Sequence, residues 1–144
     1  MSQPHPSTQS AGGSRPADVL DLTLPAKAES IGRLRRAASE FAVRHGVARP
    51  IDVALAVTEA CTNVVLHAYR DLPLGTLHLA GSLDPERVCL VVTDEGRGLT
   101  PDGDSPGLGL GLAIIAQVTT FFQIADRSPT GTVVTMGFGR LRPA

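Results

Sequence analysis

The chain has 144 residues, with 13 Lys and Arg against 14 Asp and Glu and a formal net charge of −1. This length predicts one domain with a core of its own. The balanced charge argues against binding to nucleic acid or to an anionic membrane surface. The absence of Trp and the single Tyr argue against a protein that stacks single-stranded bases.

Two cysteines, Cys61 and Cys89, stand far apart in the sequence. We expect them to be buried reduced thiols, which favours a cytoplasmic protein over a disulfide framework. We also expect that no apolar run is long enough to span a membrane and that the N-terminus lacks a hydrophobic signal core.

The first half of the chain predicts a tail, one strand and two helices. Residues 1–17 are mostly Ser, Gln, Pro and Gly, so we expect a disordered tail ahead of a single domain at 18–144. Residues 19–24 alternate loosely and end at Pro25, which predicts a strand. An amphipathic helix is expected from Ala26 to about His45, and a second from Pro50 to about Tyr69.

The second half predicts four strands and one helix. Residues 77–83 alternate as in a half-buried strand, whereas the nearly all-apolar segment 87–93 predicts a central strand covered on both faces. A third helix is expected at 107–119, followed by a closing pair of strands at 121–125 and 132–138. This order predicts a two-layer α/β sandwich, with a mixed, mostly antiparallel sheet and about three helices on one face.

Three polar residues stand four apart on the second predicted helix: Glu59, Asn63 and His67. On an α-helix they project from a face opposite to the main apolar stripe. An ordinary solvated face is one interpretation. However, this face lacks Lys and Glu pairs and is bordered by Leu55 and Leu66, which favours a concave site. An Asn oxygen suits Mg²⁺ and a neighbouring carboxylate can accept a proton, whereas His67 alone is more typical of a structural hydrogen-bonding residue.

A carboxylate followed by glycines stands at the end of the predicted central strand, as Asp94, Gly96 and Gly98. A buried carboxylate needs a partner, and the exocyclic amine of adenine is such a partner. The glycines would let a planar ring approach the backbone closely. A turn that ends the strand accounts for the same residues equally well.

A second glycine cluster, Gly107, Gly109 and Gly111, precedes an apolar helix. Exposed backbone N–H groups at a helix N-terminus favour phosphate. The spacing differs from the dinucleotide-binding fingerprint, and no Gly-Lys-Ser/Thr of a phosphate-binding loop follows. The preceding Leu99–Pro106 segment suits a mobile lid over a bound nucleotide.

In combination and in this order, the motifs resemble those of the GHKL ATPase superfamily, from about Asp18 to the end of the chain. Its N box corresponds to Glu59-x-x-x-Asn63, its next box to Asp94-x-Gly96-x-Gly98, and its glycine lid box to the run from Gly107 to Gly111. A closing Gly131-Thr132 also fits. The resemblance implies the Bergerat-type ATP-binding fold, with ATP and Mg²⁺ as cofactors.

Within the superfamily, the small size, the short lid and the segment from Glu59 to Tyr69 resemble the anti-sigma-factor serine/threonine kinases. The resemblance implies that Asn63 holds Mg²⁺, that Glu59 is the general base, and that Asp94, supported by Thr132, binds adenine. Arg97 is the nearby cation for transition-state charge. The nucleotide contacts that we expect are Asn63, His67, Asp94, Gly96, Gly98, Gly107, Leu108, Gly109, Leu110, Gly111, Leu112 and Thr132.

The same resemblance implies a function. Such a kinase phosphorylates a serine of an anti-anti-sigma (STAS-type) protein and sequesters a sigma factor as a homodimer, without contacting nucleic acid or membrane. The short lid, with Ser105 and Pro106 where basic residues often stand, keeps open an alternative, a regulatory binding module that uses ATP only to set its conformation or not at all.

Overall fold

The structure is a computed structural model that describes residues 18–98 and 108–141. The predicted tail, the predicted lid and Gly107 lie outside the described residues. The elements follow in the order β1 (Leu20–Pro25), α2 (Ala28–Arg44), α3 (Pro50–Asn63), the π-helical turn η2 (Val64–Ala68), β2 (Thr76–Leu83), β3 (Arg87–Asp94), α4 (Leu108–Val118), β4 (Phe121–Asp126) and β5 (Thr132–Gly139).

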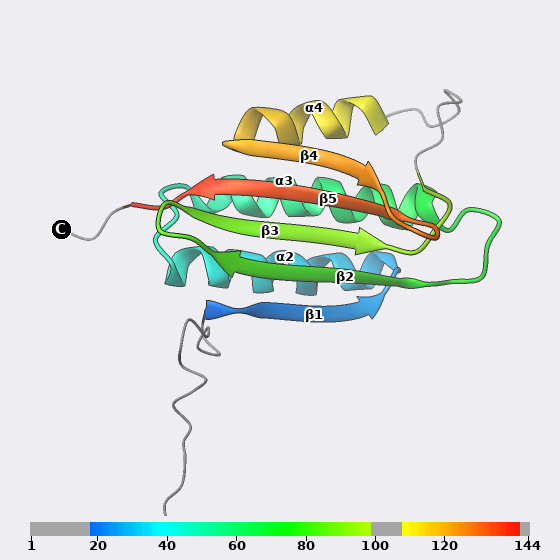
Figure 1. Ribbon diagram of the computed structural model, residues 1–144. Coiled ribbons are helices and arrows are strands. Elements are labelled where there is room, and N and C mark those ends of the chain that lie inside the picture. The colour runs from blue at the N-terminus through cyan, green and yellow to red at the C-terminus, as the bar shows by residue number, and fades with distance from the viewer. Residues whose placement is uncertain (1–17, 99–107, 142–144) are drawn as a thin grey trace, which may run out of the picture.

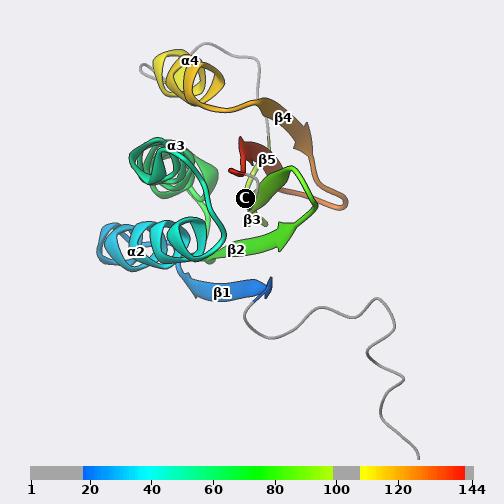
Figure 2. The same ribbon diagram turned by 90° about the vertical axis from the view of Figure 1, so that its left-hand side faces the viewer.

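The five strands form one sheet in the order β1-β2-β3-β5-β4 (Figure 1). Every pairing between neighbours is antiparallel, so the sheet has none of the parallel pairs that a mixed sheet would contain. The helices α2, α3 and α4 lie together on one side of the sheet (Figure 2). The predicted two-layer sandwich with three helices on one face is therefore confirmed.

The core lies between the sheet and the helices. Helix α2 buries Leu34, Ala38 and Phe41, which recur at the spacing of one helical face. Across from them, Leu79 and Leu90 are fully buried on β2 and β3. Each buried Leu or Phe side chain contributes about 1.5–3 kcal/mol when it leaves water, so this layer stabilises the packing of the helices on the sheet.

Strand β3 is central, but it is covered by helices on one face only. Val88, Leu90 and Val92 are buried, whereas Cys89 and Val91 on the opposite face are partly exposed. The expectation of a strand covered on both faces was wrong, because every second side chain of β3, on the face away from the helices, stays partly exposed. Both thiols are free, with Cys61 fully buried and Cys89 only half-buried.

One helical stretch, Pro50–Ala68, is long and apolar enough to cross a membrane by length and composition. This corrects the expectation that no apolar run reaches that length. The same stretch has the features of a core helix, because Val53, Val57 and Cys61 are fully buried. Its apolar character is therefore weak evidence for a membrane span.

The second predicted helix has the expected extent but not the expected form. It is α-helical from Pro50 to Asn63 and then widens into the π-helical turn η2, which Tyr69 follows. Turns of this kind occur often at functional sites. The change in pitch comes directly after Asn63, so the ideal α-helical spacing from Asn63 to His67 does not apply.

Candidate nucleotide site

Helices α3 and α4 bring Glu59, Asn63 and Gly111 together. A Cβ atom added to Gly111 would lie 3.0 Å from Glu59 Oε1 and 3.5 Å from Asn63 Oδ1. Gly111 is buried in the first turn of α4, and the two polar side chains are half-buried on α3. The N box and the end of the glycine box, which are nearly fifty residues apart in the sequence, therefore lie side by side in the fold.

Glu59 and Asn63 are the two polar side chains that face Gly111. Within residues 18–98 and 108–141, neither side chain makes a hydrogen bond or an ion pair. The same part of the chain has no group of three or more His, Cys, Asp and Glu side chains that could hold a metal. A single amide oxygen fits Mg²⁺, which takes few protein ligands and completes its shell with waters and phosphate oxygens.

Asp94 ends β3 and is 4% exposed. Burial raises the pKa of its carboxyl group, while the backbone N–H groups of Gly96 and Thr132 and the charge of Arg127 oppose the shift. The Gly96 N–H donates to Asp94 Oδ1 at 2.8 Å. An ionised carboxylate has about four acceptor positions, so two backbone donors leave capacity for an amine of a ligand.

Two glycines are required by the close packing of the loop after Asp94. A Cβ at Gly96 would overlap the carbonyl group of Ala68, and a Cβ at Gly131 would overlap the carbonyl oxygen of Asp94. Gly131 also has a φ of +115°, a conformation that other residues rarely adopt. The glycines thus let η2 and the β4–β5 turn press against this loop from two sides.

His67 lies on η2, in contact with Arg70. Arg70 Nη2 is 3.1 Å from His67 Nδ1, and because a guanidinium group only donates, Nδ1 must accept. The proton of the neutral ring is therefore on Nε2. Burial, then the charges of Arg70 and Arg97, lower the pKa of His67. Arg70 is thus a second cation beside His67, in addition to the predicted Arg97.

The remaining predicted contacts divide into three groups. Gly96, Gly98 and Thr132 lie around Asp94, and Thr132 pairs with Asp94 across β3 and β5. On α4, Gly109 and Leu110 are exposed and Leu112 is half-buried. Gly107 lies outside the described residues, as does the side chain of Leu108.

Sequence reasoning missed the residues that hold the Asp94 loop in place. The Arg97 N–H donates to the Ala68 carbonyl oxygen at 2.8 Å, and the Glu95 N–H donates to the Tyr69 hydroxyl at 2.9 Å. Glu95 also pairs with Arg127, Oε2 to Nη1, at 3.6 Å. No sequence signal marks the Ala68 carbonyl, whereas Tyr69 is conspicuous as the only tyrosine of the chain.

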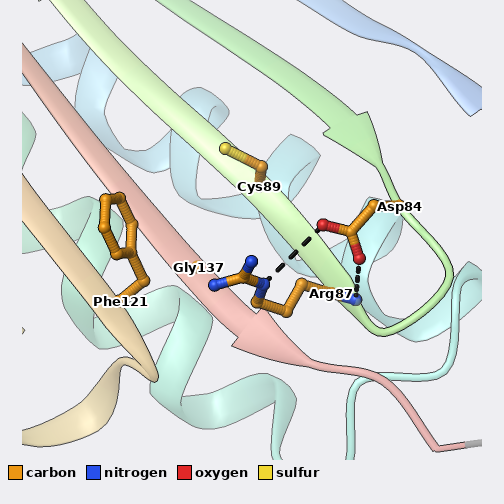
Figure 3. A pocket seen from close by; sticks show the side chains of 5 residues that line it. All are labelled: Asp84, Arg87, Cys89, Phe121 and Gly137. Atoms are coloured by element: carbon orange, nitrogen blue, oxygen red, sulfur yellow. Dashed lines mark hydrogen bonds and ion pairs between the residues drawn. The ribbon is translucent and has the colours of Figure 1, made fainter.

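A cavity of about 160 Å³ lies in another part of the fold, where it is lined by Asp84, Arg87, Cys89, Phe121 and Gly137 (Figure 3). It is on the open face of the sheet, near the start of β3 and the end of β5, whereas Asp94 ends β3. Ligand pockets of about 300–1,000 Å³ are usual, so this cavity is too small for a nucleotide. Its lining does not include Glu59, Asn63 or Asp94.

Known proteins similar to this chain include curated proteins named serine-protein kinase RsbW. The one from Halalkalibacterium halodurans is 38% identical over 94 residues, which cover 64% of this chain and 57% of the relative. The one from Bacillus subtilis is 34% identical over 95 residues, 65% of this chain and 59% of the relative. The one from Bacillus velezensis is 28% identical over 134 residues, 83% of this chain and 84% of the relative. In the first two matches the chain spans about three fifths of the relative's length.

A solved structure with a similar fold is the catalytic domain of the histidine kinase ThkA. The TM-score is 0.53 at 12% identity, over 87% of this chain and 99% of that one. A similarity at this level concerns the fold alone. The model of the histidine kinase-like ATPase domain matches residues 24–138, which include every motif of the site. The chain is therefore a member of the histidine kinase-like ATPase domain family.

Proposed function

We propose that this protein is an ATP-dependent serine-protein kinase. The proposal depends on one observation above all, the meeting of Glu59 and Asn63 with the first turn of α4, where Gly111 lies against both side chains. The names of the curated relatives give the reaction class, since they are serine-protein kinases.

Each side chain has a place in this reaction. Asp94 accepts a hydrogen bond from the adenine amine at one end of the site, and Asn63 binds Mg²⁺ at the other. When bound there, Mg²⁺ would neutralise charge that develops on the phosphate oxygens. Glu59 accepts the proton of the substrate serine hydroxyl as the serine oxygen bonds to the γ-phosphorus. The bond from this phosphorus to the β–γ bridging oxygen breaks, and ADP leaves.

The arginines and His67 complete the phosphate side. Arg97 is exposed and follows Gly96 in the loop after Asp94, and its backbone N–H donates to Ala68. In our proposal its guanidinium group binds a phosphate. His67 has its Nε2–H directed away from the bond with Arg70, and it can donate to a nucleotide oxygen. Glycine backbone N–H groups at the start of α4 supply further donors.

The partners that we propose are a STAS-type anti-anti-sigma protein, which carries the phosphorylated serine, and a sigma factor, which the protein sequesters. We further propose that it acts as a homodimer in the cytoplasm. Two free thiols accord with a reducing compartment. Light scattering of the purified protein measures the dimer directly, and a monomer at all concentrations would remove this part of the proposal.

The test is transfer of phosphate from γ-labelled ATP to a purified STAS-type partner. Glu59→Gln keeps the size of the side chain and removes the base, so we expect a loss of about 100-fold or more in rate with ATP affinity retained. Glu40→Gln is the matched control, because Glu40 is exposed on α2. Equal rates for the wild type and Glu59→Gln would reject Glu59 as the base.

The same experiment separates the alternative function. Calorimetry with ATP and Mg²⁺ shows whether the wild type binds nucleotide. Binding without transfer to any partner would identify a regulatory module that uses ATP to set its conformation. No binding at all would indicate a module that acts on its partner without nucleotide, and it would refute the kinase.

A further inference from the structure

The hydroxyl group of Tyr69 joins two segments that are otherwise separate. It donates to the carbonyl oxygen of Thr76 at 2.6 Å, at the start of β2. It accepts from the backbone N–H of Glu95 at 2.9 Å, in the loop directly after Asp94. One side chain directly after η2 thus joins the loop to the start of β2.

The ring of Tyr69 is held in place by a glycine. A Cβ added to Gly75 would overlap the ring, so the absence of a side chain at position 75 is what admits it. The carbonyl oxygen of Gly75 accepts a hydrogen bond from the N–H of Ala26 at 3.0 Å. This bond holds the backbone of Gly75, against which the ring packs. The backbone of Gly75 blocks the ring on one side, and two hydrogen bonds hold its hydroxyl group. The position of the hydroxyl is therefore fixed.

Neighbouring contacts fasten the same loop on either side of Gly96. The Glu95 N–H is held by Tyr69, and the Arg97 N–H is held by the Ala68 carbonyl oxygen at 2.8 Å. Between them, the Gly96 N–H donates to Asp94 Oδ1 at 2.8 Å. The Gly96 N–H, which orients the Asp94 carboxylate, therefore lies between two residues that are each hydrogen-bonded to the end of the second helix.

We propose that Tyr69 is a positioning residue for recognition of the nucleotide base. It does not touch the base, but it holds the loop whose Gly96 N–H orients the Asp94 carboxylate toward an exocyclic amine. The inference rests on the proposed ATP-binding function. It deepens that function by assigning selectivity for the base to the hydrogen bond between Tyr69 and the Glu95 N–H.

The test compares ATP with inosine triphosphate, which has the same phosphates but a carbonyl oxygen in place of the amine. Wild-type protein binds ATP more tightly. Tyr69→Phe keeps the ring and removes the hydroxyl, so we expect the ratio of the two affinities to fall about 5-fold or more, mainly through weaker ATP binding. A change in thermal stability alone, with an unchanged ratio, would show a merely structural role and overturn the proposal.

Thr120→Val is the matched control. The Thr120 hydroxyl also donates to a backbone carbonyl oxygen, that of Gly137, at 3.1 Å. Gly137 pairs with Cys89, whereas the residue that pairs with Asp94 on β5 is Thr132. This variant loses one comparable hydrogen bond outside the Asp94 loop, so its ratio of affinities is expected to equal that of the wild type. An equal fall in both variants would also overturn the proposal.

A second variant and a second measurement guard against misfolding of Tyr69→Phe. Gly75→Ala displaces the ring but keeps the hydroxyl, and it should lower the same ratio. Because both changes act on one contact, their effects should not add in the double variant. Amide hydrogen exchange at Glu95 should be faster in Tyr69→Phe and unchanged in Thr120→Val. Unchanged exchange at Glu95 counts against the proposal even where affinities cannot be measured.

The failure of this inference differs from the failure of the proposed function. If the wild type binds neither nucleotide, both fail together. If the wild type selects ATP and Tyr69→Phe selects it equally well, only the positioning role of Tyr69 is refuted.

Discussion

Gly111 lies so close to Glu59 that a side chain at position 111 would meet the Glu59 carboxylate, with a Cβ 3.0 Å from Oε1. The far end of a glutamate can rotate, so Gly111→Ala should displace this carboxylate without unfolding α4. A displacement of about 1 Å at a reacting group can cost roughly 100-fold in rate. We therefore expect phosphate transfer to fall by about 10- to 100-fold, measured at saturating ATP, with thermal stability near that of the wild type.

Gly32→Ala is the control for this prediction. A Cβ at Gly32 in α2 meets its nearest atom, Arg35 Nη2, at 3.6 Å, an ordinary contact. Its transfer rate should equal that of the wild type. If Gly111→Ala is fully active, the approach of α4 to Glu59 has no part in the reaction.

A different glycine should be essential for folding. Gly131→Ala places a Cβ on the carbonyl group of Asp94, and the backbone there has a φ of +115°. Neither the strand end nor the loop can move away cheaply, so we expect a loss of at least about 2 kcal/mol in the free energy of unfolding. Denaturant unfolding measures it.

Gly139→Ala gives the comparison for Gly131→Ala, because the nearest atom to its Cβ is Thr120 Cγ2 at 4.0 Å. Its free energy of unfolding should stay within about 0.5 kcal/mol of that of the wild type. A similar small change in Gly131→Ala would mean that the β4–β5 turn is not pressed against Asp94 in solution.

The buried Asp94 carboxyl should make stability depend on pH. Its pKa is raised above the ordinary value of 3.8, mainly by burial, so between 3.8 and the raised pKa the folded state binds more protons than the unfolded state. The contribution of Asp94 to stability therefore falls as the pH rises through this window. Asp94→Asn does not titrate, so its unfolding free energy relative to the wild type should increase from below pH 3.8 to neutral pH.

This difference is measured by denaturant unfolding at several pH values. A pH-independent difference would show that the carboxyl is not desolvated. Since Asp94→Asn also removes the charge that accepts the adenine amine, ATP affinity should fall by about 10-fold or more in the same variant.

The pKa of His67 should depend on the charges of the neighbouring arginines. Because burial, Arg70 and Arg97 lower its pKa, the midpoint should lie below the ordinary value of 6.5 in the nucleotide-free protein. Arg70→Gln removes one charge and should move the midpoint upward. Nuclear magnetic resonance of the imidazole protons measures both, and Arg33→Gln on the exposed side of α2 is the control. A midpoint that Arg70→Gln leaves in place would contradict the contact.

Sequence motifs predicted the architecture well because it depends on short-range patterns. Strand β2 and helix α2 each bury one regular face, so periodicity located them, whereas the nearly continuous apolar run located β3. The antiparallel pairing throughout and the open face of β3 were not predicted, because both depend on which elements are neighbours in space. Pattern alone does not tell an apolar strand covered on two faces from one covered on one face.

At the site, residue types and spacing predicted Glu59, Asn63 and Asp94, and the structure gathers the first two against Gly111. Their roles with ATP and Mg²⁺ stay predictions. The π-helical turn after Asn63 could not be foreseen, because Val64–Ala68 has a composition that suits an α-helix. The contacts of Ala68 and Tyr69 with the Asp94 loop join residues about thirty positions apart, and no local pattern encodes them.

The wide turn η2 also constrains how this sequence can change in length. Its five residues connect Asn63 on the α-helical part with Tyr69, whose hydroxyl meets Glu95. Loss of one residue there would swing Tyr69 by about 100° around the helix axis and separate the two ends of the site. Homologous chains should therefore keep a constant count of residues between these two positions, while insertions and deletions collect at the exposed hairpin bend from Asp84 to Glu86.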